Sequence, residues 1–372
     1  VTSSGVRLGP SSTLAFFWQD IASATIVTLA FALMRPRWVT WAVCAIVVGY
    51  IALSAPLTIV LGSPLTWTMI RAARGALSDS VRHHVTAHNV IAIGLVWAAG
   101  LMGAWIAGIL TRRLRVTASA VMLTACALGL WAASRIDTIG LDRNALTALL
   151  PRDHAVGALS IRAASRRSPF PGASQQAGAV DLTSYRGAAR GMNVLLIVLE
   201  STAAQYLRIY GAADDPMPTV TRFATHALIY DRAYAAYPES VKGLYATLCG
   251  RMPVFGMPAE AHAALPCASI ARSFGTAGYR TALFHSGRFG YLGMADLLRG
   301  MGFGHLEDAG AIGGHIESSF GVDESSTVDR LLQWIDAADT PMPFFAAYLP
   351  TAGHHPYATA RPGPFAGDTD FD

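Results

Sequence analysis

Four long apolar segments occupy the first third of the chain, at residues 14–34, 38–61, 89–110 and 116–133. Each is close to the roughly 20 apolar residues that an α-helix needs to span a bilayer. Asp20 is the one acidic residue within them. Because a charge at the bilayer centre costs about 3 kcal/mol, we expect Asp20 to face a neighbouring helix or the interface. The pattern predicts a four-helix transmembrane domain over residues 1–135.

Arginines in the short connections predict the orientation of these helices. They lie between the first two segments and between the last two, at Arg35, Arg37, Arg112, Arg113 and Arg115. By the positive-inside rule both loops are cytoplasmic. Everything after Arg135 is then expected on the outer side of the membrane.

Two smaller patterns lie in the same domain. The connection at residues 62–88 has the apolar spacing of an amphipathic helix that lies on the membrane surface. Gly100, Ala104 and Gly108 form a ridge of small residues suited to close helix packing.

The second half of the chain alternates short apolar runs with helical patterns. The predicted strands are 193–199, 228–230, 280–284 and 343–349, and the predicted helices are 219–226, 242–249, 269–277, 294–301 and 325–338. Alternation of this kind is typical of βαβ units around a parallel sheet, so residues 192–372 are predicted to form an α/β sandwich. The run at 193–199 is expected to be buried on both faces. The mixed 136–191 segment is expected to be a linker with a juxtamembrane helix near 146–159.

Composition agrees with a membrane part. The 372 residues are 52% hydrophobic and 14% charged, and the mean hydropathy is +0.38. The net charge of +4 does not indicate nucleic-acid binding, because the arginines flank apolar segments instead of forming a patch with interleaved aromatics. Cys249 and Cys267 lie in the outer part of the chain, where an oxidising compartment permits a disulfide, but their spacing alone leaves the pairing open.

Candidate chemistry lies at Glu200 and Ser240. Glu200 directly follows the predicted strand at 193–199, at the carboxyl end where parallel sheets place ligands, with Ser201 and Thr202 available to cap a helix behind it. Ser240 precedes an apolar helix, whose unpaired N–H groups and positive dipole end suit an anionic ester. The structural alternatives are a carboxylate in a capping turn and an ordinary N-cap serine.

The order of several motifs resembles the sulfatase and alkaline phosphatase superfamily. The motifs are Asn193-Val-Leu-Leu-Ile-Val-Leu-Glu-Ser201, Tyr230-Asp-Arg-Ala-Tyr-Ala235, Ser240 ten residues before Gly250-Arg-Met-Pro253, Gly278-Tyr-Arg-Thr-Ala-Leu-Phe284, and Pro343-Phe-Phe-Ala-Ala-Tyr348 leading to His354-His-Pro-Tyr357. The ordered set resembles most closely the membrane-anchored branch, which includes lipoteichoic acid synthases and phosphoglycerol or phosphoethanolamine transferases. The resemblance implies an outer-domain metalloenzyme that cleaves or transfers a sulfate or phosphate ester.

The resemblance also implies roles for particular residues. Glu200 matches the first metal-binding acid and Ser240 the nucleophile, which would itself touch one divalent metal ion, zinc or manganese. His354 matches the first position of a His-x-Pro-aromatic signature that contacts the substrate anion. Lys242 and His285 are weaker candidates for the same anion; a solvated helix start and a hydrogen-bonded strand end are their structural alternatives.

Two departures from the family pattern narrow these expectations. Lys242 and Leu244 stand where a sulfatase carries the proline and arginine that direct formylglycine formation, which favours an unmodified Ser240. The family also completes its metal site with a later Asp-His pair, which is absent between His354 and Asp372. The sandwich is therefore expected to be C-terminally incomplete in this sequence.

The resulting hypothesis is a multi-pass protein of a bacterial-type inner membrane with its catalytic domain on the periplasmic or extracellular side. It would move a phosphoryl headgroup from a phospholipid donor, through Ser240, to a glycan or lipid acceptor. The alternatives are a sulfatase or phosphodiesterase that transfers its ester to water, and a noncatalytic envelope sensor or scaffold.

Overall fold

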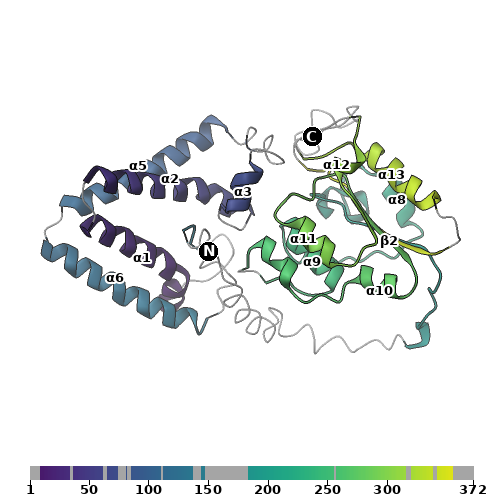
Figure 1. The fold of residues 1–372 in the computed structure, drawn as a ribbon, viewed down its shortest axis with the longest axis horizontal. Coiled ribbons are helices and arrows are strands. Elements are labelled where there is room, and N and C mark those ends of the chain that lie inside the picture. Colours follow the sequence, from purple (N-terminus) through teal and green to yellow (C-terminus); the bar gives the residue numbers. More distant parts are fainter. Residues whose placement is uncertain are drawn as a thin grey trace. The chain divides into compact units, whose positions relative to one another are not determined.

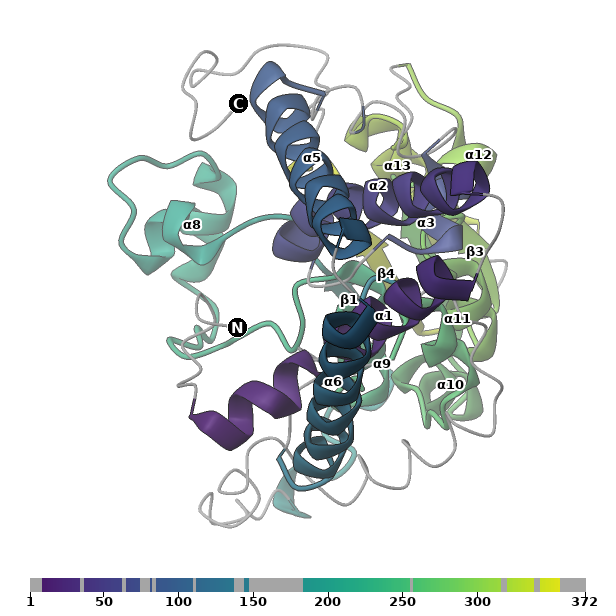
Figure 2. The same cartoon turned by 90° about the vertical axis from the view of Figure 1, so that its left-hand side faces the viewer.

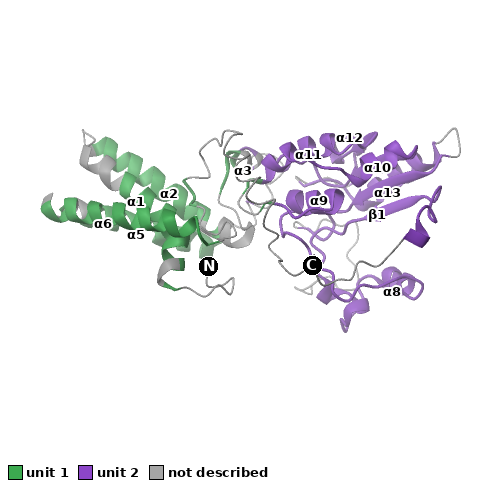
Figure 3. Ribbon diagram, turned by 90° about the horizontal axis from the view of Figure 1, so that it is seen from below, with its two compact units in different colours: residues 1–70, 83–167, 254–258 green, residues 71–82, 168–253, 259–372 purple. Residues whose placement is uncertain are grey.

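A computed structural model describes residues 9–33, 37–61, 65–73, 81, 85–109, 112–136, 144–146, 183–254, 257–315, 320–337 and 342–354. These residues fall into two compact units (Figure 3). The helical unit draws its described residues from 1–70, 83–167 and 254–258, and the α/β unit draws its own from 71–82, 168–253 and 259–372.

All four predicted apolar segments are helical. The helices of the N-terminal part are α1 (Pro10–Leu33), α2 (Arg37–Leu61), α3 (Trp67–Ala72), α5 (Ala87–Ile109) and α6 (Arg112–Ala133). Helix α1 packs along α6, and α2 packs along α5 (Figure 1, Figure 2). Among the described residues, Ala87–Ile106 and Val116–Ala133 are long and apolar enough to cross a membrane, and Trp38–Ser54 is a shorter apolar stretch. Spanning by all four helices stays a prediction.

The surface helix predicted within residues 62–88 corresponds in part to the six-residue α3. Asp20 has a specific polar partner, since its carboxylate accepts a hydrogen bond from the amide of Asn144, which follows α6. The Asn144 backbone N–H also donates to Gln19 Oε1 at 3.1 Å, and Ser23 donates to Asn144 Oδ1 at 3.2 Å. These bonds tie the segment after α6 to α1. The juxtamembrane helix predicted near 146–159 lies almost wholly outside the described residues.

Glycine allows the closest approach in both helix pairs. A Cβ atom built on Gly100 of the predicted ridge would overlap the side chain of Val48 in α2. A Cβ on Gly129 of α6 would overlap the Trp18 side chain of α1 and lie 2.8 Å from the carbonyl oxygen of Leu14. The contact at Gly129 includes backbone, so α1 must move away to accommodate any larger residue.

Gly129→Ala is therefore expected to destabilise the helical unit, by about 1–3 kcal/mol for an overpacked contact, despite the better helix propensity of alanine. Gly103→Ala is the matched control, because a Cβ there meets nothing within 4 Å. Thermal unfolding of the two variants in detergent measures the difference. Equal midpoints would show that α1 and α6 do not pack through Gly129.

The α/β unit is built on a parallel sheet of four strands, β1 (Val194–Ile197), β2 (Arg280–His285), β3 (His305–Glu307) and β4 (Phe344–Leu349). Their order is β1-β4-β2-β3, so β4, the last of the described strands along the chain, lies between β1 and β2. Three of these strands were predicted. The predicted strand at 228–230 is wrong: this segment is irregular, and Leu228 is 79% exposed. The three-residue β3 was not predicted.

The helices of this unit are α8 (Pro218–Ala224), α9 (Ser240–Cys249), α10 (Ile270–Thr276), α11 (Met294–Gly300), α12 (Ala309–Ile312) and α13 (Glu324–Asp336). Single 3₁₀ turns or short 3₁₀ helices occur at Thr183–Tyr185, Ala204–Tyr206, Arg208–Tyr210 and Ala259–Ala264. The five predicted helices are confirmed with small shifts of their ends, and α12 was missed.

Helices pack on both faces of the central strands. On one face, Leu331 of α13 packs against Phe284 and Tyr348. On the other, Phe274 of α10 stacks on Phe345 with ring centroids 4.7 Å apart. Strands β2 and β4 are buried from their second residue onward, as expected for strands covered on both sides.

Strand β1 does not have the predicted burial on both faces. Its residues alternate between half-buried and exposed, and Leu195 and Ile197 are 46% and 51% exposed. The reason is its position, because β1 is the edge strand of the described sheet and the described residues cover one of its faces. Its continuous apolar run does not distinguish such an edge strand from a central one.

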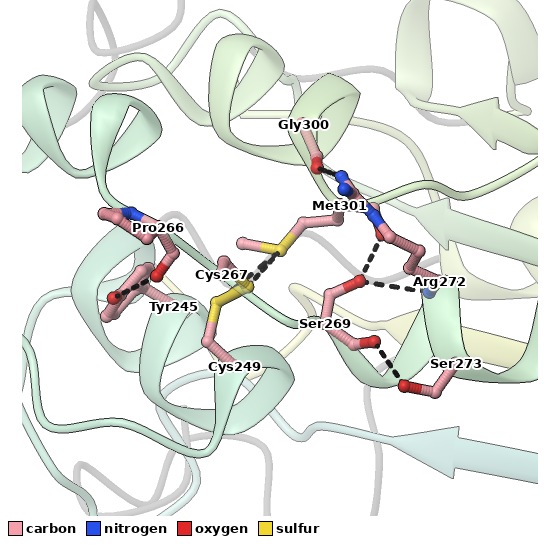
Figure 4. Close-up of a disulfide and its surroundings, with 9 residues drawn as sticks. All are labelled: Tyr245, Cys249, Pro266, Cys267, Ser269, Arg272, Ser273, Gly300 and Met301. Carbon is pink, nitrogen blue, oxygen red and sulfur yellow. Dashed lines mark hydrogen bonds between the residues drawn. A yellow bond between two sulfur atoms is a disulfide. The ribbon is translucent and has the colours of Figure 1, made fainter.

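Cys249 and Cys267 form a disulfide, which resolves the pairing that the sequence left open (Figure 4). The bridge joins the last residue of α9 to the segment that leads into α10. Met301 Sδ packs against it, 3.4 Å from Cys267 Sγ and 3.7 Å from Cys249 Sγ. Ser269 extends this contact: its hydroxyl donates to the Met301 carbonyl and also caps α10 by accepting from the Arg272 N–H at 3.1 Å. The bridge therefore fixes the end of α9 against α10 and the end of α11.

Replacing both bridge cysteines with serine should lower the free energy of unfolding of the α/β unit by about 3 kcal/mol, since the bridge closes a loop of 18 residues. Chemical denaturation of the double variant tests this. Cys126→Ser is the control, because Cys126 is a free thiol in α6. A double variant as stable as the control would contradict a bridged native state.

Candidate active site

A pocket lies at the carboxyl ends of the strands. It is lined by Glu200, Ser240, His285, Gly287, Arg288, Tyr291, Met294, Phe320, Thr351 and His354. Four of the five residues predicted for the site are in this set. They come together because β1, β2 and β4 are parallel, so the segments that follow them leave the sheet at the same edge.

Glu200 follows β1 in a tight turn. The next residue, Ser201, has φ = 52°, a left-handed conformation that is uncommon for a residue with a side chain. Gly353 packs directly on this turn, since a Cβ on it would lie 2.8 Å from the Glu200 carbonyl oxygen. Ser201 and Thr202 do not cap a helix as expected: the next element, Ala204–Tyr206, has no side-chain cap. The turn instead presents the Glu200 side chain to the pocket.

Ser240 is the first residue of α9, and its hydroxyl donates to Glu200 Oε1 at 3.0 Å. The N-cap of the helix is Glu239, whose carboxylate accepts from the Val241 N–H at 2.7 Å and the Lys242 N–H at 3.2 Å. Two of the amides expected to face an anionic ester are therefore already occupied. Burial raises the pKa of Glu239, and those two hydrogen bonds oppose the shift. Glu239 thus fixes the first turn of α9 and leaves the Ser240 hydroxyl directed at Glu200.

His285 ends β2 and is almost completely buried. Its Nδ1 lies 2.9 Å from the Leu349 carbonyl oxygen. Because a carbonyl oxygen only accepts, Nδ1 carries the proton in this contact, and Nε2 is left as the acceptor of a neutral ring. Burial lowers the pKa of His285, an effect that the carboxylates of Glu200, Asp308 and Glu324 oppose. A neutral His285 can accept a proton or a hydrogen bond at Nε2.

Glu324 fixes the two loops that enter the pocket after β2 and β4. Its Oε1 accepts from the Ser286 hydroxyl at 2.8 Å and from the backbone N–H groups of Thr351 and Ala352 at 2.7 and 2.8 Å. Its Oε2 accepts from the Tyr348 hydroxyl, and burial together with this bond raises the pKa of that phenol. Glu324 therefore determines where the loop at residues 350–354 lies, and with it His354.

His354 lies at the pocket beside an aromatic ring. Its imidazole packs against the Phe320 ring with centroids 4.4 Å apart. The backbone N–H of His354 donates to the Thr351 carbonyl at 2.8 Å. The rest of the His-x-Pro-aromatic signature, at residues 355–357, lies outside the described residues.

Lys242 is not among the residues that line the pocket. Its side chain is buried, and its Nζ lies 4.1 Å from the centroid of the Tyr237 ring. The geometry favours a cation–π contact within the fold over a direct grip on an anion in the pocket.

The sequence reasoning missed six pocket residues, of which three have polar side chains: Arg288, Tyr291 and Thr351. Arg288 and Tyr291 follow β2 in a glycine-rich segment that carries no periodic pattern, and Thr351 follows β4. Burial and the nearby carboxylates of Glu239, Glu200 and Glu260 raise the pKa of Tyr291, so its phenol stays protonated. The signal that could have identified Arg288 is its position three residues past the end of a central strand.

The site offers part of a metal-binding arrangement. The Glu200 carboxylate and Ser240 hydroxyl are hard oxygen donors held 3.0 Å apart, which suits two ligands of one divalent ion. Among the described residues, no group of three or more His, Cys, Asp or Glu side chains could hold a metal. The pair fits one edge of a metal site, and the described residues do not supply the remaining ligands.

Residues 192–372 match a family model described as Sulfatase. The matched residues include all four strands of the α/β unit, which confirms the resemblance and the α/β fold class expected from the sequence. The match begins two residues before β1 and includes Glu200, Ser240, His285 and His354.

Three solved structures are similar to this chain. They are a protein in the alkaline phosphatase superfamily from Vibrio parahaemolyticus (22% identity, TM-score 0.40), the lipoteichoic acid synthase LtaP from Listeria monocytogenes (16%, 0.42) and the C-terminal periplasmic domain of EcEptC from Escherichia coli in complex with Zn (15%, 0.37). The alignments cover 46%, 47% and 48% of this chain, and 42%, 44% and 49% of those chains. This chain therefore spans less than half the length of each.

Gly287→Ala should disturb the pocket through His285, because a Cβ at position 287 would lie 2.5 Å from His285 Nε2 and 2.7 Å from Cε1. The buried ring has little space to move, so we expect a loss of about 1–3 kcal/mol in the free energy of unfolding and a changed imidazole NMR signal. Gly290→Ala, in the same segment, meets nothing within 4 Å and should leave both unchanged. An unshifted His285 signal in Gly287→Ala would show that Nε2 does not face Gly287.

Proposed function

We propose that this chain is a membrane-anchored transferase that moves a phosphoryl headgroup, phosphoglycerol or phosphoethanolamine, from a phospholipid to a glycan or lipid acceptor in the cell envelope. The observation that carries the proposal is the contact between the Ser240 hydroxyl and Glu200 Oε1, 3.0 Å apart in the pocket of a sulfatase-family domain. The contact holds a potential nucleophile beside a proton acceptor and possible metal ligand.

The proposed reaction has two displacement steps at phosphorus. In the first, Ser240 Oγ bonds to the phosphorus of the phosphodiester, and the bond to the diacylglycerol oxygen breaks; that oxygen takes a proton. In the second, an acceptor hydroxyl bonds to phosphorus, the bond to Ser240 Oγ breaks, and the proton lost by the acceptor returns to Ser240. Glu200 accepts the Ser240 hydrogen bond at the start, and neutral His285 can hold a proton at Nε2.

A divalent ion, zinc or manganese, is proposed as the cofactor. Glu200 and Ser240 would hold it, and when bound it would favour the ionised form of the Ser240 hydroxyl. His354 is proposed to contact the substrate anion. Lys242 retains a supporting role through its contact with Tyr237, next to the turn that leads into α9.

The localisation is part of the proposal. Two stretches of the helical unit are long and apolar enough to cross a membrane. A membrane is also where a phospholipid donor is found. The Cys249–Cys267 disulfide supports an oxidising compartment for the α/β unit, which agrees with a periplasmic or extracellular domain on a bacterial-type inner membrane.

A hydrolase is the second candidate function. The matched family model is described as Sulfatase, and a sulfatase or phosphodiesterase would use the same pocket with water as the acceptor. Release of inorganic sulfate or phosphate without a modified acceptor would favour the hydrolase.

Ser240→Ala should abolish headgroup transfer, a loss of at least about 1,000-fold if the covalent route is used, and leave the fold intact. Full-length protein incubated with candidate phospholipids should gain the mass of a phosphorylated headgroup on the peptide that contains Ser240. Thr247→Ala is the matched control on α9, because Thr247 is exposed and bonds only to the Gly243 carbonyl.

Undiminished transfer by Ser240→Ala would rule out the covalent route. A Ser240 peptide that loses two hydrogens would indicate formylglycine and assign the protein to the sulfatases. Phosphate or sulfate release with no labelled serine would support direct hydrolysis.

A further inference from the structure

Arg288 is the one arginine or lysine among the described residues that line the pocket. The other titratable lining residues are the acid Glu200, the phenol Tyr291 and the imidazoles His285 and His354. A histidine ring is a cation only when it is protonated, whereas a guanidinium is permanently charged. An ester anion that reaches Ser240 therefore meets one permanent cation on the described wall of the pocket.

The Arg288 side chain has no structural partner among the described residues. It makes no hydrogen bond and no ion pair with any of them. Its Nη1 lies 3.7 Å from the position that a Cβ on Gly310 would occupy, which places the guanidinium near the start of α12. Asp308, the N-cap of α12, does not pair with the guanidinium. Its carboxylate accepts from two backbone groups: Oδ2 from the Phe289 N–H at 2.8 Å and Oδ1 from the Gly310 N–H at 2.9 Å.

The backbone on both sides of Arg288 is fixed. The Gly287 carbonyl accepts from the Ala309 N–H at 2.9 Å, and Gly287 also forms an isolated antiparallel bridge with Gly321. On the other side, the bond from the Phe289 N–H to Asp308 holds the chain. The segment is thus anchored at residues 287 and 289, and the residue between them carries an unpaired guanidinium. These contacts fix the backbone that carries Arg288, and a planar guanidinium is suited to bidentate contact with the oxygens of a phosphate or sulfate group.

We propose that Arg288 binds the anionic oxygens of the ester in this pocket and so restricts the substrates to phosphate or sulfate esters that carry a charged non-bridging oxygen. The inference rests on the proposed function and names the residue that recognises its substrate class. It assigns to Arg288 the anion contact that the sequence suggested for Lys242, whose Nζ lies over the Tyr237 ring.

The test is direct anion binding by the full chain in detergent, measured by calorimetric titration with inorganic phosphate and, separately, with inorganic sulfate. Arg288→Met should weaken binding of the preferred anion by about 10- to 100-fold, the loss expected for a charge-assisted pair, and Arg288→Lys should weaken it less. Arg299→Met is the matched control, because Arg299 is exposed on α11 and pairs with Asp296 at 2.7 Å. Since the Arg288 side chain bonds to no described residue, the thermal unfolding midpoint of Arg288→Met should equal that of the wild type.

The same titrations on Ser240→Ala separate recognition from turnover. Weaker binding in Arg288→Met with a normal unfolding midpoint supports the inference, and comparison of the two anions identifies a phosphate or a sulfate site. Binding by Arg288→Met equal to that of the wild type overturns it, and so does a wild type that binds neither anion. If Arg288 proves necessary for anion binding but no headgroup is transferred, the proposed function fails while the anion assignment stands.

Discussion

The position of β4 between β1 and β2 is the constraint on which the candidate site depends. Strands β1 and β2 are not paired with each other in the described sheet, because β4 lies between them and pairs with both. Tyr348 of β4 lies opposite Ile197 of β1 on one side and opposite Phe284 of β2 on the other. The pairing continues past the strand ends, because the Val198 N–H donates to the Tyr348 carbonyl and the Ser286 N–H to the Leu349 carbonyl. The backbone at the end of β4 therefore sets the relative positions of Glu200 and His285.

The carboxylates around the pocket have separate tasks, which their hydrogen bonds define. Glu239 binds amides in the first turn of α9, Asp308 binds the amides of Phe289 and Gly310, and Glu324 holds the loops after β2 and β4. Glu200 differs from these three acids in its partner, because its carboxylate accepts a hydrogen bond from a side chain, the Ser240 hydroxyl. Three acids stabilise backbone geometry, and the Glu200 carboxylate lies in the pocket beside Ser240. This division explains how several carboxylates can lie close together without all competing for one ligand.

Much of this arrangement could be predicted from the sequence, because Glu200, His285 and His354 follow predicted strands and Ser240 begins a predicted helix. Parallel pairing then brings them to one edge of the sheet without further information. Lys242 does not line the pocket, because two residues along a helix turn the side chain through about 200°, away from the face of Ser240, and its contact with an anion stays a prediction. Arg288 was missed although it follows a central strand, because its segment has no periodic pattern and is held by contacts with residues far along the chain. The exposure of β1 was missed because an apolar run does not report which neighbours a strand has.

The disulfide has a consequence for the order in which the α/β unit forms. Cys249 and Cys267 are 18 residues apart, so the loop between them closes at a small entropic cost and needs only nearby chain. The sheet needs β4, which pairs with β1 across about 150 residues and is synthesised last. A short covalent loop can thus hold the end of α9 while β1 and β2 still lack the strand that joins them. Until β4 pairs, the edges of both strands are open to pairing with other chains, and oxidation of the cysteines at that stage would stabilise one part of the domain before the sheet is complete.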